Sequence, residues 1–304
     1  MTIDLQSRSP IVECVPNFSE GKRPEIVRSI ANEIGSVPGI RVLDLHIDVD
    51  HNRSVVTFIG KPEAVLEAAL AGVRAASRLI DMSHHKGAHP RIGATDVVPL
   101  IPVSKIEMDE CITLARKLAE RIWNELEIPT YLYGYAALRD DRKRLERIRL
   151  EGFEQIRDLV AIDSDRHPDF GGPQLHPKAG ATIVGARDPL IAFNIDLKSS
   201  DLKVAREIAS AIRERNSGLK GLKALGIYLE SRSCVQISTN ITRTDLVSPY
   251  RVFKKVKEEA SKRGIDIRRV ELAGLMPLES IISSAREAIH LDSLDAKRII
   301  ELNL

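Results

Sequence analysis

The sequence has few of the residues that mark a disulfide-stabilised, cysteine-ligated or nucleic-acid-binding protein. Its three cysteines, Cys14, Cys111 and Cys234, form no CxxC pair, which excludes a cysteine-rich zinc site and a thioredoxin-like motif. Widely spaced single thiols are typical of a reducing compartment. One tryptophan and a net charge of +2, from 45 basic and 43 acidic residues, give no sign of the basic surface that binds phosphates. We therefore expect no nucleic-acid partner.

Long apolar runs and the common phosphate-binding and nucleophile motifs are also missing. No run approaches the ~18 apolar residues of a membrane span, and the N-terminus lacks the apolar core of a signal peptide. We expect a cytoplasmic protein with no membrane partner. Neither GxGxxG after the first strand nor GxxxxGK[ST] nor GxSxG occurs, which argues against the usual nucleotide cradles and against a serine hydrolase.

The order of predicted secondary-structure elements repeats along the chain. The first half is predicted to contain β-α-β-β-α-β followed by a helix and a strand, at 11–15, 24–35, 40–46, 53–59, 62–80, 95–101, 108–124 and 130–134. After an irregular region from 136 to 178, with one helix near 143–160, the order begins again. The second set is 191–197, a helix capped by Ser200 or Asp201, 223–230, 234–239, a helix ending at Gly264, and 267–273. The pattern predicts an α+β protein of two ferredoxin-like units, 1–178 and 179–304.

The loop from 81 to 96 concentrates three histidines, a lysine, an arginine and two glycines between a helix and a strand. Pro90 restricts the preceding His89 to extended backbone, while Gly87 and Gly93 permit turns on either side. An imidazole held in this way, with an ordinary pKa of about 6.5, suits proton transfer near neutral pH. Any one of these histidines, taken alone, is equally consistent with a solvated loop residue.

Two further stretches concentrate ionisable side chains, at 48–53 and at 167–180, and the second is also rich in glycine and proline. Seven of the eight histidines lie between residues 46 and 176. Loops of this composition tend to carry binding or catalytic residues on a rigid scaffold.

Five segments in order resemble the formiminotransferase domain family, whose vertebrate members are fused to a cyclodeaminase. The opening motif ECVPNFSEG occupies 13–21, and the others are 51–55, 81–98, 168–171 and 184–194. The resemblance spans nearly the whole chain, and the family fold, two ferredoxin-like α/β subdomains, agrees with the repeat. We expect no fused cyclodeaminase domain and a homodimer.

The resemblance implies transfer of the formimino group of N-formimino-L-glutamate to N5 of tetrahydrofolate, a step of histidine catabolism and one-carbon metabolism. Tetrahydrofolate is then a co-substrate, and no metal is required. N5 attacks the amidine carbon, and the glutamate nitrogen leaves from a tetrahedral intermediate. The family's catalytic histidine falls on His89, which can take the proton from N5 and return it to the leaving nitrogen.

Both implied substrates are polyanions, so cationic and glycine-rich binding residues are expected. The basic candidates are Arg53, Lys86, Arg91, Lys178 and Arg187. The family's folate-contacting loop falls on Gly171, Gly172 and Gly180, and Asn17, Asp48 and His176 complete the expected set. The alternative for each basic residue is a solvated surface charge, and for each glycine a purely conformational role.

Two departures from the family pattern keep other functions open. Ala88 stands where a glutamate usually precedes the catalytic His-Pro pair. His46 stands where vertebrate members have an aspartate, for which Asp48 and Asp50 are the candidate replacements. A relative acting on another N-substituted reduced pterin, such as a methanopterin, and a non-catalytic folate-binding module are the alternatives.

A zinc hydrolase is a further alternative, because His85 and His89 are four residues apart, as two ligands on one helical face would be. Pro90 makes a continuous helix there unfavourable, and no H-E-x-x-H motif is present.

Overall fold

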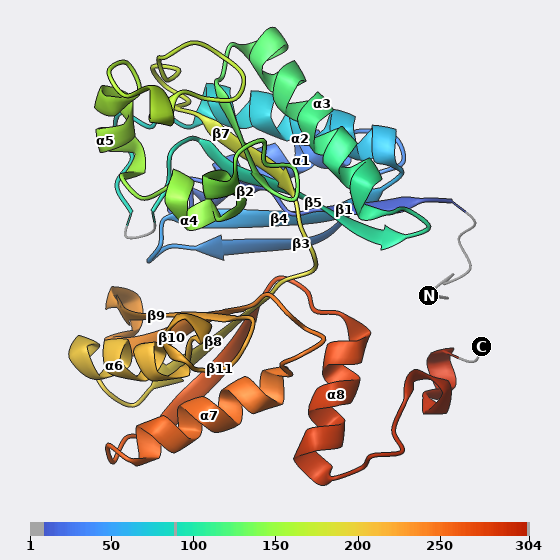
Figure 1. Cartoon of the computed structure of the whole chain (residues 1–304), viewed down its shortest axis with the longest axis vertical. Coiled ribbons are helices and arrows are strands. Elements are labelled where there is room, and N and C mark those ends of the chain that lie inside the picture. The colour runs from blue at the N-terminus through green and yellow to red at the C-terminus, as the bar shows by residue number, and fades with distance from the viewer. Residues whose placement is uncertain (1–8, 88–89, 303–304) are drawn as a thin grey trace. The chain divides into compact units, whose positions relative to one another are not determined.

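The computed structural model describes residues 9–87 and 90–302 (Figure 1). The chain divides into two compact units, Met1–Arg187 and Asp188–Leu304. Each has its own sheet and its own apolar core.

The first unit is built on an antiparallel ferredoxin-like core. Its elements are β1 (Ile11–Cys14), β2 (Asn17–Phe18), α1 (Pro24–Gly35), β3 (Arg41–Asp48), β4 (Arg53–Gly60), α2 (Pro62–Leu79) and β5 (Thr95–Ser104). Strands β1 and β2 together form the first strand of the motif, between β4 and β5, while β3 pairs with the other edge of β4. The β-α-β-β-α-β arrangement predicted from the sequence is confirmed for this unit.

Three further elements extend this sheet, namely α3 (Met108–Leu126), β6 (Thr130–Gly134) and β7 (Thr182–Ala186). Strand β7, which the sequence did not predict, lies between β5 and β6 and pairs with both in parallel. All five of its residues are buried. Because β7 belongs to this sheet, the first unit ends at Arg187 and the boundary expected near residue 178 is too early.

Helices partly cover both faces of the sheet in the first unit. Helices α1, α2 and α3 cover one face over a core that includes Phe18, Phe58 and Leu66. Short helices of the region 136–178 pack on the other face, against Tyr131 and Tyr133. They are η1 (Asp140–Lys143), α4 (Leu145–Ile148), α5 (Gly152–Leu159) and η2 (Ser164–Arg166). The single helix expected near 143–160 is divided because Gly152, with φ of +67°, leaves the helical region.

The second unit repeats the ferredoxin-like order. Its main elements are β8 (Ile191–Leu197), α6 (Leu202–Ile212), β9 (Leu222–Leu229), β10 (Cys234–Ile241), α7 (Pro249–Ser261), β11 (Ile267–Ala273) and α8 (Leu278–Ile289). The sheet order is β11-β8-β10-β9, entirely antiparallel. Asp201 caps α6 by accepting hydrogen bonds from the Lys203 and Val204 amides. Of the two residues expected as the cap, Asp201 is therefore the one that serves.

Helix α8 follows the second repeat, was not predicted, and packs on α7. The remaining short turns of this unit are η3 (Glu214–Asn216), η4 (Glu230–Arg232), η5 (Ala296–Arg298) and η6 (Ile300–Leu302). Among the described helices of both units, none is long and apolar enough to cross a membrane.

Candidate functional site

The loop from 81 to 96, here called the His-rich loop, connects α2 to the start of β5 and lies next to the segment 176–181 that precedes β7. Three backbone hydrogen bonds join them: Met82 N to Lys178 O at 2.8 Å, Ala94 N to Ala179 O at 2.8 Å, and Ala181 N to Ile92 O at 3.0 Å. Two sequence segments expected to form the site are thus adjacent. His89, the expected catalytic residue, and Ala88 lie outside the described residues.

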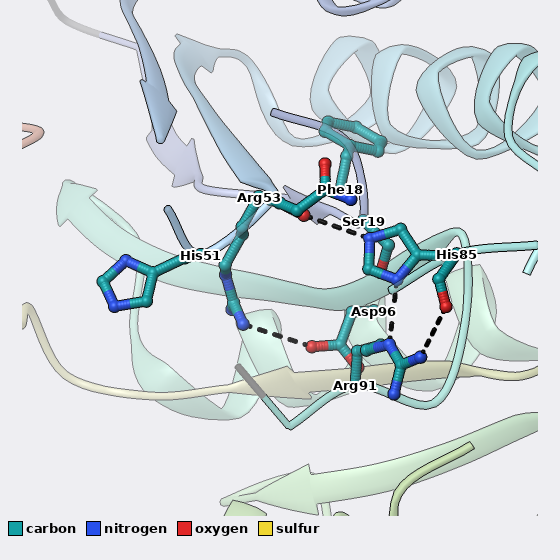
Figure 2. A pocket seen from close by; sticks show the side chains of 8 residues that line it. Phe18, Ser19, His51, Arg53, His85, Arg91 and Asp96 are labelled. Atoms are coloured by element: carbon teal, nitrogen blue, oxygen red, sulfur yellow. Dashed lines mark hydrogen bonds and ion pairs between the residues drawn. The ribbon is translucent and has the colours of Figure 1, made fainter. Parts of the chain in front are cut away.

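A small pocket forms where this loop meets β2 and the turn before β4 (Figure 2). It is lined by Phe18, Ser19, His51, Asn52, Arg53, His85, Arg91 and Asp96. These residues come from three of the segments that resemble the formiminotransferase family, 13–21, 51–55 and 81–98. Its volume of about 10 Å³ is far below the roughly 300–1,000 Å³ of ordinary ligand pockets and is close to that of one water molecule. The described residues therefore enclose only a small polar recess.

Arg53, the first residue of β4, is the principal cation of the pocket. Its Nε and Nη2 donate to the Asn17 Oδ1 at 3.0 and 2.6 Å, and the Asn17 Nδ2 donates to the Val15 carbonyl at 2.8 Å. Asn17 is therefore oriented with its oxygen toward the guanidinium. Burial, followed by the nearby Arg149 charge, lowers the pKa of Arg53 to about 9, so Arg53 remains charged at pH 7. The structure brings these two expected binding residues together.

Asp96 is the buried carboxylate of the site, and it was not among the expected site residues. Its Oδ1 accepts a hydrogen bond from the Ile92 amide at 2.9 Å, which fixes the end of the His-rich loop. Its Oδ2 lies 2.5 Å from Nη2 of Arg149 and 3.4 Å from Nη1 of Arg53. Figure 2 shows the Arg53 side chain directed at Asp96. Asp96 lies in the segment 81–98 that resembles the family, so the sequence could have indicated it as a site residue. No spacing in the sequence predicts that Arg149 pairs with it.

His85 is a neutral residue that joins the loop to the turn before β4. Its Nε2 lies 3.1 Å from the Asn52 carbonyl, which can only accept, so Nε2 carries the proton. Its Nδ1 accepts from Nε of Arg91 at 2.9 Å. Both ring nitrogens are thereby engaged, which disfavours His85 as a zinc ligand. Within residues 9–87 and 90–302, no group of three acidic, histidine or cysteine side chains is placed to hold a metal ion.

Arg91, expected to bind a substrate carboxylate, is bound by protein groups. Besides His85 Nδ1, it donates to the His85 carbonyl at 2.8 Å and to both carboxylate oxygens of Glu154, at 2.7 and 3.1 Å. These contacts tie the His-rich loop to α5. They favour a role for Arg91 in holding the loop, and direct substrate contact stays a prediction.

Acidification should destabilise this loop. Burial, with a smaller contribution from Arg91, lowers the pKa of His85, although its hydrogen bond to the Asn52 carbonyl opposes this. A lowered folded-state pKa means that the stabilisation is fully present above the ordinary value of about 6.5 and is lost as pH falls through the folded value. We expect the free energy of unfolding, measured with urea between pH 7 and pH 5, to fall more for the wild type than for His85→Gln. The exposed His84→Gln serves as control, and equal pH dependence of all three proteins would contradict the assignment.

Asp48 and His51 form a pair at the rim of the pocket. Asp48 Oδ2 lies 2.6 Å from His51 Nδ1, and its Oδ1 accepts from the His51 amide at 2.9 Å. Burial acts to raise the pKa of Asp48, but the hydrogen bonds from His51 outweigh it and hold the pKa below its usual value. Asp48 was expected to bind substrate, but both of its carboxylate oxygens are hydrogen bonded to His51 in the same turn. His51, which sequence reasoning did not select, lines the pocket instead.

The Asn52 side chain links three of the segments that resemble the family, its own, 13–21 and 81–98, through hydrogen bonds. Its Oδ1 accepts from the Gly21 amide at 2.9 Å, and its Nδ2 donates to the Lys86 carbonyl at 2.8 Å. A Cβ on Gly21 would lie 2.1 Å from the Asp48 carbonyl oxygen, so this close approach requires glycine. The Lys86 side chain is exposed.

Within the described residues, the contacts of the segment 171–180 mainly hold its own backbone conformation. His176 Nδ1 accepts from the amides of Lys178 and Ala179, at 3.2 and 2.9 Å, and forms a tight turn. Gly180 has φ of +71°, and a Cβ there would lie 2.3 Å from the Ile92 carbonyl oxygen. Gly171, with φ of +110°, packs against Trp123 and Pro129. These contacts explain the two glycines without a ligand.

Three other expected binding residues do not line the described pocket. Gly172 and Lys178 are exposed, and nothing lies within 4 Å of a Cβ built on Gly172. The Arg187 amide donates to the Leu100 carbonyl at 3.1 Å, and the Arg187 charge offsets part of the rise that burial causes in the pKa of Glu13. Their roles in substrate binding stay predictions.

Sequence comparisons match most of the chain to one family of proteins. The profile described as the formiminotransferase domain, N-terminal subdomain, matches residues 11–187, and that of the formiminotransferase domain matches 192–302. These limits agree with the division between the two units.

Similar proteins share this chain's length or extend beyond it. The glutamate formimidoyltransferase of Thermoplasma acidophilum is 42% identical over 293 residues, which cover 96% of each chain. The glutamate formimidoyltransferase of Streptococcus pyogenes serotype M1 is 40% identical over 97% of this chain and 98% of its own. The formimidoyltransferase-cyclodeaminase of Mus musculus is 41% identical over 91% of this chain and 52% of its own length.

Proposed function

This chain belongs to the formiminotransferase family, and from that membership we propose that it is a glutamate formimidoyltransferase. It moves the formimino group of N-formimino-L-glutamate to N5 of tetrahydrofolate and releases glutamate. The observation that carries the proposal is the identity of about 40% to two glutamate formimidoyltransferases over nearly the full length of each. The pocket supports it, because the matched motifs converge there around a buried arginine.

The reaction exchanges one nitrogen for another at an amidine carbon. N5 of the folate forms a bond to that carbon, the bond to the glutamate nitrogen breaks, and the proton lost by N5 is delivered to the departing nitrogen. His89 is proposed to carry that proton, because the family's catalytic histidine falls on this position of the matched segment. The reaction needs neither a metal nor a covalent nucleophile. Burial raises the pKa of all three cysteine thiols, that of Cys111 to about 11, so each remains protonated and a poor nucleophile.

A panel of donors and pterins tests the substrate assignment, including the consequence of Ala88. N-formimino-L-glutamate, N-formimino-glycine and N-formyl-L-glutamate are each paired with tetrahydrofolate and with tetrahydromethanopterin, and kcat/KM is measured. The proposal requires the first donor with tetrahydrofolate to have the highest kcat/KM. Preference for another pair would reassign the substrate, and binding without turnover of any pair would indicate a non-catalytic module.

The proposal extends to a reducing, cytoplasmic setting and to a homodimer. The three thiols are free and buried, as is common where disulfides do not form. The second unit has an apolar groove of about 550 Å³ between α7, α8 and β11, lined in part by Phe253, Met276 and Ile281. Exposed apolar patches of this kind often mark protein–protein contacts, and we propose that a second copy of the chain covers it.

Disruption of the groove should separate the dimer. Ile281 on α8 is 51% exposed, so Ile281→Glu places a charge in the proposed contact without disturbing a core. We expect sedimentation equilibrium to give a dimer for the wild type and a monomer for Ile281→Glu. Ile162→Glu, at a position of the first unit that is 81% exposed, should leave the dimer intact. A wild-type monomer at all concentrations would contradict the proposal.

A further inference from the structure

One side chain joins the two ends of the segment 85–91 in the His-rich loop. Arg91 reaches back to His85: its Nε donates to His85 Nδ1 at 2.9 Å, and its Nη2 donates to the His85 carbonyl at 2.8 Å (Figure 2). Only 12% of the Arg91 side chain is exposed. His89, the proposed acid–base residue, lies between these two ends in the sequence.

The first end of this segment is also attached to the turn before β4. His85 Nε2 donates to the Asn52 carbonyl at 3.1 Å, and Asn52 Nδ2 donates to the Lys86 carbonyl at 2.8 Å. A Cβ on Gly87 would lie 2.7 Å from the His51 carbonyl oxygen, so the segment passes closely against this turn at a glycine. The first end therefore has its own attachment to the scaffold of the first unit.

The last end of the segment is attached to α5 through Glu154. Both carboxylate oxygens of Glu154 accept from Arg91, at 2.7 and 3.1 Å, in the paired geometry that arginine and carboxylates favour. Helix α5 belongs to the irregular region 136–178 and lies outside the ferredoxin-like repeat. Its Phe153 and Ile156 are buried, so the helix is itself held by the first unit and can support the loop.

These contacts occupy most of the Arg91 guanidinium. An arginine side chain has five N–H donors, and Arg91 makes four hydrogen bonds through them, to His85 and to Glu154. A substrate carboxylate bound in the bidentate way would need two of these donors. It would therefore displace Glu154 or His85 and release the end of the loop, so the geometry favours positioning over direct substrate contact.

We propose that Arg91 is a positioning residue of the transferase: by joining His85 to Glu154, it holds the segment 85–91, and with it the acid–base residue of the reaction, in one place. The inference rests on the proposed function, which assigns the proton transfer to His89. A misplacement of about 1 Å can cost on the order of 100-fold in rate. The clamp formed by His85, Arg91 and Glu154 therefore acts on kcat, and it leaves KM unchanged because Arg91 does not contact the substrates.

The test compares Arg91→Gln, Arg91→Lys and Arg121→Gln in the full chain. Arg91→Gln should lower kcat by about tenfold or more, with both KM values changed by less than about twofold. Arg91→Lys keeps the charge but cannot reach both partners, so its kcat should also fall. Arg121 of α3 is the matched control, because two carboxylates, Glu67 and Glu125, likewise share its guanidinium and none of the three lines the pocket. Arg121→Gln should leave kcat and KM unchanged.

Direct binding of a substrate by Arg91 would give the opposite pattern. Arg91→Gln would then raise one KM by about tenfold with little change in kcat, and that result would overturn the inference. Equal losses of kcat in Arg91→Gln and Arg121→Gln would overturn it as well.

Glu154→Ala keeps the test decisive if Arg91→Gln does not fold. It alters only a side chain that is 58% exposed, and it removes the attachment of the clamp to α5. We expect kcat to fall by about threefold or more, since the loop is then less firmly held, with both KM values unchanged. An unchanged kcat in Glu154→Ala would overturn the inference.

Amide hydrogen exchange measures the clamp without turnover. In the peptide 82–92, exchange should be about tenfold faster in Arg91→Gln than in the wild type, because loss of charge-assisted hydrogen bonds lets the loop open more often. Arg121→Gln should match the wild type. Faster exchange in Arg91→Gln, combined with a wild type that turns over no substrate pair, would support the clamp and contradict only the proposed function. Equal exchange in Arg91→Gln and the wild type would overturn the inference.

Discussion

The His89→Asn variant should fold normally, still bind a reduced folate, and lose at least about 100-fold in kcat, because a general acid–base group contributes roughly 10²–10⁴-fold. Asparagine has a similar size and can form hydrogen bonds, but it cannot carry a proton between the two nitrogens. The measurement is the steady-state rate with both substrates saturating, together with calorimetric binding of 5-formyltetrahydrofolate. The folate should bind with nearly the affinity of the wild type.

His84→Asn is the matched control for this prediction. His84 belongs to the same loop, and its side chain is 85% exposed. Its replacement should leave kcat close to the wild-type value. A His89→Asn variant that retains a rate within about threefold of the wild type would remove His89 from the proton transfer, because general acid–base catalysis is worth far more.

Replacement of Asp96 by asparagine should cost about 3–5 kcal/mol of folding free energy, the usual result when one partner of a buried ion pair is removed. Asparagine can still accept the hydrogen bond from the Ile92 amide, but it leaves the guanidiniums of Arg53 and Arg149 without their buried counter-charge. Urea unfolding at pH 7 measures the loss, and the transferase rate should fall with it because Asp96 holds the Ile92 amide of the His-rich loop.

An exposed ion pair provides the control for Asp96. Asp140 pairs with Lys143 at 2.7 Å and is 93% exposed, so Asp140→Asn should change stability by less than about 0.5 kcal/mol. If Asp96→Asn also stayed within about 1 kcal/mol of the wild type, which is far below the cost of breaking a buried pair, Asp96 would not be the charge centre of the site.

Local periodicity was sufficient to predict both ferredoxin-like repeats. Helix α1 runs from Pro24 to Gly35 as expected, since proline favours the first turn and the apolar stripe is continuous. Strand β7 was missed because five buried residues with neither alternation nor helical spacing give no periodic signal. Only tertiary pairing with β5 and β6 makes this segment a strand, and the early domain boundary follows from that omission.

The site was predictable where chemistry follows sequence motifs and not where it depends on tertiary pairing. Asn17, Arg53 and the loop 81–96 were expected together and lie together. Arg149 comes from an irregular segment, 53 positions from Asp96, and no spacing rule links the two. The contacts of His176 and Gly180 are internal to their turn and to its neighbouring loop, and a sequence alone does not distinguish such roles from ligand binding.

The dependence of glutamate release on folate distinguishes the proposed formimino transfer from hydrolysis. The purified protein is incubated with N-formimino-L-glutamate, with and without tetrahydrofolate, and glutamate and N5-formimino-tetrahydrofolate are quantified over time. We expect glutamate to appear only when tetrahydrofolate is present, in a one-to-one ratio with the formimino product, and at a rate unaffected by a chelator. Release of glutamate without folate, abolished by chelation and restored by zinc, would contradict the proposed transfer and indicate a metal-dependent hydrolase.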